Sequence, residues 1–314
     1  MNAVKFIVAL AAACLVPAIA CGGVPAGNCD RPCLIGIAHS YLDALATHAP
    51  EGLSMAPAAT FTENNVTLKM GDALWKTVSA VDTNATIFAD PAAQAVGLIV
   101  AVREGARPAL LAARLELVHG RVDGLETIVA RQNAASFLDA NAVRGAAVLN
   151  APVAPASRRP RAVLTAIADS YFRRLIDPGA PMPPFDPRCN RIENGVQSTN
   201  NPHPPTSSPL NPALSRLGCL AQFETGALTF ISKIRSVRYT LVDEEKGLVL
   251  ASAIFDHDGV PHAAASGNAP RLSANLPSPM SFVVDELFKI DDGRIREIEA
   301  VISAVPYGIL PVRQ

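Results

Sequence analysis

The sequence lacks the features that direct a protein to a lipid bilayer or a nucleic acid. After the first twenty residues, no uninterrupted apolar stretch reaches the roughly 18 residues that a membrane-spanning helix needs. Lysine and arginine number 27 against 28 aspartate and glutamate, and they form no basic run. Phosphate groups bind to clustered positive charge, so the composition argues against a nucleic-acid partner or an anionic membrane surface.

Several catalytic motifs are also missing. The chain has no GxGxxG or GxxxxGK[ST] phosphate loop, no GxSxG nucleophile elbow and no HExxH motif. It has no CxxC pair, and its six histidines show no metal-ligand spacing, so we expect no metal site. Any catalysis is therefore expected to be acid–base chemistry that needs no cofactor.

The sequence does contain enough apolar material for a large folded core. Hydrophobic residues make up 49% of the 314 positions, which argues against disorder and suggests about two domains. The first twenty residues stand apart, because Lys5 precedes an apolar run that ends in small residues before Cys21. This pattern predicts a signal peptide over residues 1–20 and a secreted or periplasmic protein. The alternative is a lipoprotein anchored at Cys21, although Ala18 stands where that motif prefers leucine.

Export would place five cysteines in an oxidising compartment, where disulfides persist. Cys189 and Cys219 bracket a loop rich in proline, serine and asparagine, and we predict that they form a disulfide. Cys29 and Cys33 lie at the start of the first predicted helix, and their partners stay open. An odd number leaves one thiol free, lipidated or intermolecular, with Cys21 among the candidates. The oligomeric state is open, and a homo-oligomer is one alternative.

The chain is predicted to be an internal duplication. Apolar residues at helical spacing predict amphipathic helices over residues 33–48 and 163–176. The helices share the patterns AHSYL and ADSYF, so that Tyr171 follows Tyr41 by 130 positions. Later matches lie 153 and then 173 positions apart. The chain therefore divides into a first domain over residues 21–149 and a second over 162–314.

The growing offset locates two insertions in the second domain, over residues 196–218 and 257–280. Both are rich in proline, serine, asparagine or glycine and are expected to be long surface loops. Such loops are either lids and binding loops or tolerated insertions without a role. Residues 150–161 form a Pro/Ala-rich linker between the domains.

Each domain repeats one order of elements, which predicts an α+β fold. An amphipathic helix is followed by a short strand, a short helix near Trp75 or Phe223, and three or four long strands. In the second domain we predict the long strands over residues 233–242, 248–255, 282–290 and 294–303. We expect two tandem cones, each with helices packed on a curved antiparallel sheet around a small-molecule pocket. The alternative is one continuous sheet without an internal two-fold relation.

Short motifs connect this order of elements to a known group of proteins. The motifs are YLDAL at 41–45, TFTENN at 60–65, CNRIENG at 189–195 and VDEEKG at 242–247. The order resembles the nuclear transport factor 2-like (SnoaL-like, ketosteroid-isomerase-like) superfamily. The motifs are similar to those of the secreted, duplicated DUF8021-type proteins that are widespread in fungi. The resemblance covers about residues 30–314.

The resemblance implies where catalytic residues would lie. In the ketosteroid-isomerase-like branch, a tyrosine on the first helix donates a hydrogen bond and an acidic residue on the first strand moves a proton. Tyr41 and Glu63 hold these positions in the first domain, and Tyr171 and Glu193 hold them in the second. A carboxylate in an apolar pocket suits a general acid or base near neutral pH. A tyrosine that is simply buried and hydrogen-bonded is the alternative.

Neighbouring polar residues are candidates for substrate binding. Asn64 and Asn194 follow the two glutamates and could donate to an oxyanion. Arg191 precedes Glu193 by two positions, so it either holds that carboxylate ionised, binds an acidic substrate or forms a structural ion pair.

Three further ionisable residues are weaker candidates. His39 and Asp169 hold equivalent positions on the two predicted helices. They line either the wall of the pocket or the surface of the protein. His257 ends a predicted strand where the second insertion begins. It is either a hinge of a lid or a site residue, or it has neither role.

Two functions follow from these observations. The first, which the resemblance implies, is a secreted, cofactor-independent lyase, dehydratase, isomerase or cyclase. Its substrate would be a small hydrophobic compound, with aromatic and lignin-derived compounds among the candidates. The alternative is a non-catalytic protein that binds a small ligand or a partner. We expect any chemistry in the second domain, because only this domain has the two insertions and Arg191 beside its glutamate.

Overall fold

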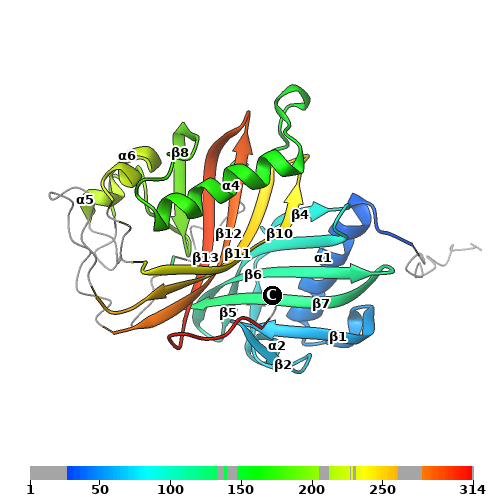
Figure 1. Ribbon diagram of the computed structural model, residues 1–314. Helices are drawn as coiled ribbons and strands as arrows, with labels where there is room; N and C mark the ends of the chain where they lie inside the picture. The colour runs from blue at the N-terminus through cyan, green and yellow to red at the C-terminus, as the bar shows by residue number, and fades with distance from the viewer. Residues whose placement is uncertain are drawn as a thin grey trace, which may run out of the picture.

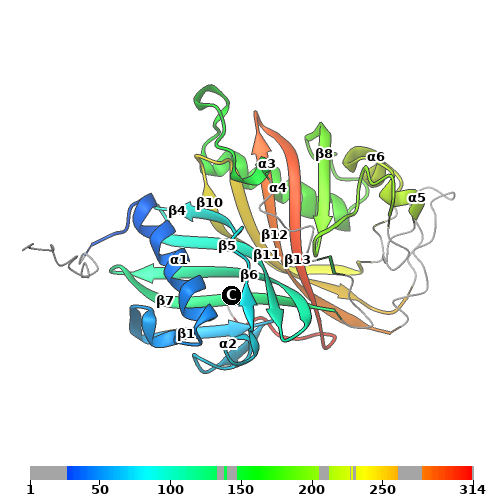
Figure 2. The same cartoon turned by 180° about the vertical axis from the view of Figure 1, so that it is seen from behind.

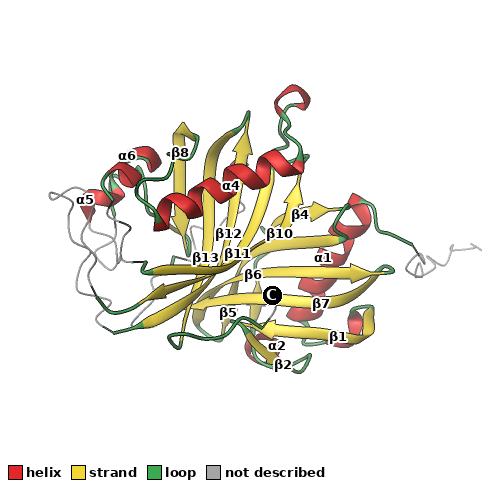
Figure 3. Cartoon of the chain, in the orientation of Figure 1, coloured by secondary structure: helices red, strands yellow, loops and turns green. Residues whose placement is uncertain are grey.

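The computed structural model describes residues 27–132, 138–139, 147–204, 212–226, 228, 231–260 and 278–312. The predicted signal peptide, Cys21 and most of the 257–280 insertion lie outside these residues. The fold is α+β with two separate mixed sheets, and one long helix packs on each sheet (Figures 1 and 3). We call residues 27–132 the first half and residues 147–312 the second half. No helix within the described ranges is long and apolar enough to cross a membrane.

The first half begins with its long helix and continues into a seven-stranded sheet. The elements are α1 (Arg31–Ala46), β1 (Met55–Glu63), β2 (Val66–Leu68), α2 (Leu74–Thr77), β3 (Ala80–Val81), β4 (Thr86–Asp90), β5 (Ala95–Glu104), β6 (Arg107–Val118) and β7 (Arg121–Arg131). The strand order is β2-β1-β7-β6-β5-β3, and β4 also pairs with β5. Asp30 caps α1 by accepting a hydrogen bond from the backbone N–H of Cys33.

The second half repeats this arrangement with a six-stranded sheet of order β10-β11-β12-β13-β8-β9. Its elements are α3 (Ala147–Asn150), α4 (Arg161–Ile176), β8 (Phe185–Glu193), β9 (Val196–Gln197), α5 (Pro212–Ser215), α6 (Cys219–Glu224), β10 (Lys233–Asp243), β11 (Leu248–His257), β12 (Met280–Asp291) and β13 (Arg294–Val305). The four long strands predicted from the sequence are therefore present, as are both amphipathic helices and both short helices.

The expectation of antiparallel sheets is wrong in one respect. The strand that follows each long helix runs parallel to the last strand of its half, so that β1 pairs with β7 and β8 pairs with β13. The other paired strands in each sheet are antiparallel. In each half the intervening strands form between these two. The last strand then lies beside the first strand and runs in the same direction. Apolar periodicity identifies a strand but not the direction of its neighbour.

Three apolar cores hold the layers together. One lies between α1 and the first sheet, and a second lies between α4 and the second sheet. A third core, which we call the seam, joins the two sheets; it contains Phe88, Ala95, Ile99, Leu110, Ala112, Ile128, Ala130, Leu149, Leu241, Leu248, Leu250, Ile254, Val283, Leu287 and Val301. Figures 1 and 2 show the helices on opposite outer faces and the strands of the two sheets crossing steeply. The central strands are therefore buried on both faces, which explains their nearly continuous apolar sequence.

Ion pairs between partly exposed arginines and buried aspartates cross the seam in a reciprocal pattern. Arg31 at the start of α1 donates to both carboxylate oxygens of Asp243, over 2.8 and 2.7 Å. Arg161 at the start of α4 donates to Asp90 over 2.5 Å. The backbone N–H of Ala89 donates to Asp243 (3.1 Å), and that of Val242 donates to Asp90 (2.8 Å). Each half thus supplies an arginine and a backbone amide to the other half's aspartate.

The segment predicted as a linker is packed rather than free. Val153 is buried, and its backbone N–H donates to the carbonyl of Glu245 over 2.9 Å. Pro155–Ser157 form a single 3-10 turn. Leu149, just before Asn150, lies in the seam core. Residues 150–161 therefore pack against the second half as they lead from α3 into α4.

The predicted disulfide between Cys189 and Cys219 is present, and it joins β8 to α6. A second disulfide joins Cys29 to Cys33 at the start of α1. The loops that these two disulfides close differ greatly in length: the sequence separation is 30 for Cys189–Cys219 and 4 for Cys29–Cys33. A longer loop restricts the unfolded chain more strongly.

We therefore expect the double variant Cys189→Ala/Cys219→Ala to lose about 3 kcal/mol of unfolding free energy. The matched variant Cys29→Ala/Cys33→Ala should lose less, because its bridge closes the shorter loop. Chemical denaturation of both variants measures the difference. A larger loss from the Cys29→Ala/Cys33→Ala variant would contradict the expectation that the bridge closing the longer loop stabilises the fold more.

Candidate functional site

The interior of the second half is built around Tyr171. This residue lies on the inner face of α4, where apolar residues recur at helical spacing, and it is fully buried. Three phenylalanine rings surround it, with centroid distances of 5.4 Å to Phe172, 5.1 Å to Phe223 and 5.2 Å to Phe288. Burial raises the pKa of the Tyr171 phenol well above its ordinary value, so its hydroxyl stays protonated and can donate a hydrogen bond.

A buried arginine lies beside this tyrosine. Arg191 on β8 donates to the side-chain oxygen of Gln222 over 2.6 Å and forms an ion pair with Glu193. Its guanidinium carbon lies 5.9 Å from the Tyr171 ring centroid and 5.8 Å from that of Phe223. The charge is therefore held by one carboxylate, one amide and two aromatic faces.

Glu286 completes the group, and the sequence analysis did not identify it. It lies on β12 with 3% of its surface exposed, and the Tyr171 hydroxyl donates to its Oε1 over 3.4 Å. Its Oε2 has no hydrogen-bond partner in the part of the chain that the structure describes. Burial raises the pKa of Glu286 to about 8; Arg191 opposes this rise and Glu193 adds to it. Glu286 is therefore a neutral acid at pH 7 that can lose a proton just above neutrality.

We call Tyr171, Arg191, Glu193, Gln222 and Glu286 the Tyr171 cluster. It contains two carboxyl groups in different environments. Glu193 is paired with a guanidinium, whereas Glu286 faces apolar surroundings and a phenol. Pairs of carboxyl groups with contrasting environments are a common arrangement for acid and base roles. The cluster has the groups required for proton transfer.

The first half has no such cluster at the corresponding positions. Its Tyr41 is also buried, and its ring packs edge-on against Trp75 with the centroids 5.6 Å apart. Phe61 stands 130 positions before Arg191, and Ala113 stands 173 positions before Glu286. At these two offsets the first half therefore has apolar side chains, where the second half has a guanidinium and a carboxyl group.

Glu63, the first half's candidate base, has its carboxylate bound on both oxygens. Arg131 donates to Oε1 over 2.8 Å, and the backbone N–H of Leu74 donates to Oε2 over 3.0 Å. The carboxylate thus connects β1 to β7 and to the start of α2. This arrangement matches a structural ion pair.

The two asparagines follow these glutamates in turns with positive φ, 50° at Asn64 and 48° at Asn194. The Asn64 side chain accepts from the N–H of Val129 (2.8 Å) and donates to its carbonyl (3.2 Å). Asn194 makes the same pair of bonds with Ile302, over 2.8 and 3.0 Å. Each amide continues the parallel pairing of β1 with β7 or of β8 with β13, and its nitrogen donates to a backbone carbonyl.

The remaining predicted residues lie apart from the hydrogen bonds of the cluster. His39 is exposed on α1. Asp169 accepts a hydrogen bond from the Tyr239 hydroxyl over 2.7 Å and forms an ion pair with Arg173. His257 is buried at the end of β11, opposite Met280, at the border of the described ranges.

The sequence contained a signal for Glu286. Two adjacent acids, Asp285 and Glu286, interrupt the apolar strand SFVVDELF, and side chains alternate between the faces of a strand. If that strand is buried on both sides, one acid must face each core. Recognising both cores would have placed Glu286 beside Val284 and Phe288.

A small cavity adjoins the cluster at the end of α4. It has a volume of about 20 Å³ and is lined by Arg174, Leu175, Pro178, Phe223, Gly226 and Leu228. Phe223 separates this cavity from Tyr171, because its ring contacts both.

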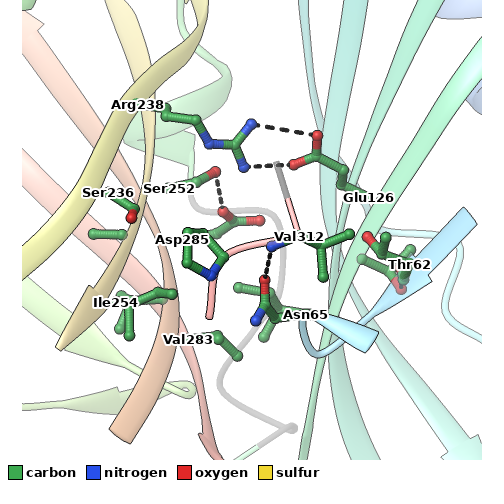
Figure 4. Close-up of a pocket in the computed structure, with 15 residues that line it drawn as sticks. Thr62, Asn65, Glu126, Ser236, Arg238, Ser252, Ile254, Val283, Asp285 and Val312 are labelled. Carbon is green, nitrogen blue, oxygen red and sulfur yellow. Dashed lines mark hydrogen bonds and ion pairs between the residues drawn. The ribbon is translucent and has the colours of Figure 1, made fainter. Parts of the chain in front are cut away.

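A second, more polar cavity lies between the two sheets (Figure 4). It has a volume of about 60 Å³, enough for a few water molecules. Arg238 donates to Glu126 across it over 2.8 Å, and Ser252 donates to Asp285 over 2.6 Å. Burial raises the pKa of Asp285 to about 6; the Ser252 hydrogen bond opposes this rise and the charge of Glu126 adds to it.

This raised pKa gives the fold a pH dependence with a defined sign. The folded state holds the Asp285 proton more tightly than the unfolded chain, whose ordinary value is 3.8. Protonated Asp285 therefore stabilises the folded state below pH 4, and this stabilisation is lost as the pH rises through 6. We expect Asp285→Asn to gain on the order of 2 kcal/mol relative to wild type between pH 4 and pH 7. Denaturant titrations at both pH values measure this, and a constant difference would contradict it.

Comparisons with known proteins agree with the predicted family. The family model described as "Domain of unknown function (DUF8021)" matches residues 157–302, which confirms the predicted resemblance for the second half. No curated protein matches the chain.

Solved structures also match the chain. A candidate ketosteroid isomerase from Kribbella flavida is 14% identical with a TM-score of 0.23, covering 32% of this chain and 81% of its own. AclR, a candidate hydroxylase from Streptomyces galilaeus, is 16% identical with a TM-score of 0.28, covering 47% of this chain and 83% of its own. Each alignment spans less than half of this chain.

Proposed function

We propose that the second half is a cofactor-independent acid–base catalyst that acts on a small, mostly apolar molecule. The observation that carries the proposal is Glu286, a buried carboxyl group beside a phenol, whose Oε2 has no hydrogen-bond partner among the described residues. Burial of an unsatisfied carboxyl group costs free energy. Such a group supports a role in which a substrate or a transition state supplies the missing partner.

Within this proposal, each residue of the Tyr171 cluster has a role. Tyr171 donates to an oxygen on which negative charge develops. Glu193 accepts a proton from the substrate, and the neutral Glu286 returns one. Arg191 orients the Glu193 carboxylate and balances its charge. This division suits an isomerase, dehydratase or lyase acting beside a carbonyl group, and the aromatic rings around the cluster favour an aromatic substrate.

We further propose that the chain arose by duplication and that only its second half kept the chemistry. The reciprocal Arg31–Asp243 and Arg161–Asp90 contacts support a pseudo-two-fold relation between the halves. In the first half, Phe61 and Ala113 fill the positions of Arg191 and Glu286. The first half then acts as a folded support that covers the back of the catalytic sheet.

Export belongs to the same proposal. Its support is the pair of disulfides, since such bonds persist in secreted and periplasmic proteins.

A binding protein without catalysis is the second candidate. The observation that favours it is the dense aromatic packing around Tyr171, beside a cavity of only about 20 Å³. In that case the cluster would hold a ligand through hydrogen bonds and leave it unchanged.

A ligand screen separates the two candidates. Aromatic ketones, esters and diaryl ethers are tested by thermal shift on the wild type and on Glu286→Gln, Glu193→Gln and the matched first-half variant Glu63→Gln. Ligands that bind are then incubated in D₂O and followed by NMR. Catalysis predicts deuterium incorporation or product formation that Glu286→Gln and Glu193→Gln lose and Glu63→Gln retains. Unchanged ligands that bind to the wild type would support the binding candidate.

A further inference from the structure

Two acceptor triplets for N-linked glycosylation occur in the first half. They are Asn65-Val66-Thr67 and Asn84-Ala85-Thr86, and neither has proline at the middle position. A triplet in an exporting cell becomes a modification site only where the folded chain can carry the sugar. The structure places the two asparagines in different environments.

Asn84 lies in an exposed turn between β3 and β4, and its side chain faces solvent. Its amide nitrogen bonds to the Asp82 carboxylate two positions earlier over 3.1 Å. The backbone N–H of Asn84 donates to the same Asp82 oxygen over 2.8 Å. The turn would therefore keep its stabilising bond if the side-chain amide carried a glycan.

Asn65, by contrast, holds the C-terminal segment in place. Its amide donates to the carbonyl of Leu310 over 2.7 Å, and its oxygen accepts from the N–H of Val312 over 3.0 Å. It occupies the turn between β1 and β2 with a φ of 63°. A glycan on this nitrogen would compete with the segment that covers the cavity between the sheets (Figure 4).

We propose that Asn84 is an N-glycosylation site. The side-chain nitrogen of Asn84 attacks the anomeric carbon of an oligosaccharide carried on a lipid pyrophosphate. A carbon–nitrogen bond forms, the bond from the sugar to the pyrophosphate oxygen breaks, and the nitrogen loses one proton. The proposal rests on export through a compartment that contains this donor. It does not rest on the function of the second half.

The neighbouring strand sets the order of events. Thr86 is buried once β4 pairs with β5, where it lies opposite Ile99. Transfer to Asn84 therefore precedes completion of this sheet. The finished glycan extends from the outer turn, while the cluster around Tyr171 lies in the other half, so the sugar leaves the proposed catalytic residues untouched.

The test uses residues 21–314 secreted from a eukaryotic host behind that host's own leader, so that export is assured. Wild type, Asn84→Gln and the matched variant Asn65→Gln are treated with peptide N-glycosidase in H₂¹⁸O and analysed by mass spectrometry. We expect wild type and Asn65→Gln to lose a glycan and to carry ¹⁸O-labelled aspartate at position 84, and Asn84→Gln to lack this modification. Secreted wild type without a glycan at Asn84 would overturn the proposal, as would a glycan confined to Asn65.

Discussion

Replacing Asp243 with alanine is expected to lower the free energy of unfolding by about 3–5 kcal/mol. The Asp243 carboxylate is buried and accepts two bonds from Arg31, one from the N–H of Ala89 and one from the N–H of Lys246. Its removal leaves a partly buried guanidinium and two backbone donors without their acceptor. Asp90→Ala should cost somewhat less, because Asp90 accepts one bond from Arg161, whose side chain is 40% exposed, besides the backbone bonds from Val242 and Ala93.

An exposed aspartate provides the matched control. Asp292 also forms an ion pair with an arginine, Arg159, but 71% of the Asp292 side chain is exposed. Because the φ of Asp292 is 48°, where asparagine is tolerated and alanine is strained, the control is Asp292→Asn, which should cost less than about 1 kcal/mol. Urea denaturation of the three variants gives the comparison. Equal losses for Asp243→Ala and Asp292→Asn would show that the seam contacts do not hold the two halves together.

The second large effect is expected at Glu286. Once a substrate has been found, Glu286→Gln should lower its turnover by about 10²–10⁴, because glutamine keeps the shape but cannot exchange a proton. Glu63→Gln should leave the rate nearly unchanged, since that carboxylate is bound to Arg131 and to the backbone of Leu74. Steady-state kinetics of the two variants measures this. A loss in Glu63→Gln alone would place the chemistry in the first half.

The pH profile gives an independent check on the same residue. If Glu286 acts as the acid, activity requires its protonated form and falls as the pH rises through about 8. The fall should be absent from whatever activity remains in Glu286→Gln. A profile with the same alkaline limb in both proteins would exclude Glu286 as its source.

Much of the fold could be predicted because local pattern determines it. Apolar spacing placed α1 and α4, and alternating apolar segments with turns such as Asp291-Asp292-Gly293 placed the strands. The Cys189–Cys219 bridge followed from two cysteines on either side of one loop. The parallel pairing of β8 with β13 did not follow, because the direction of a distant neighbour depends on tertiary packing.

The site was predictable only in part. Tyr171, Arg191 and Glu193 came from motifs and near spacing, and the structure brings them into one cluster. Gln222 and Glu286 come from α6 and β12, far along the chain, so no local motif joins them to Tyr171. Asn64 and Asn194 were predicted to bind substrate because each follows a glutamate. Their positive φ and their hydrogen bonds to Val129 and Ile302 instead give them a structural role in the turns.

The most direct test of a proton-transfer site in the second half is the titration of Glu286 itself. Protein labelled with ¹³C at the glutamate carboxyl carbons is followed by NMR from pH 4 to pH 10, and Glu286→Gln identifies the signal. We expect Glu286 to titrate near pH 8, because it is buried beside Tyr171. A titration near the ordinary value of 4.5 would mean that Glu286 is charged at neutral pH, and it would contradict the proposed acid.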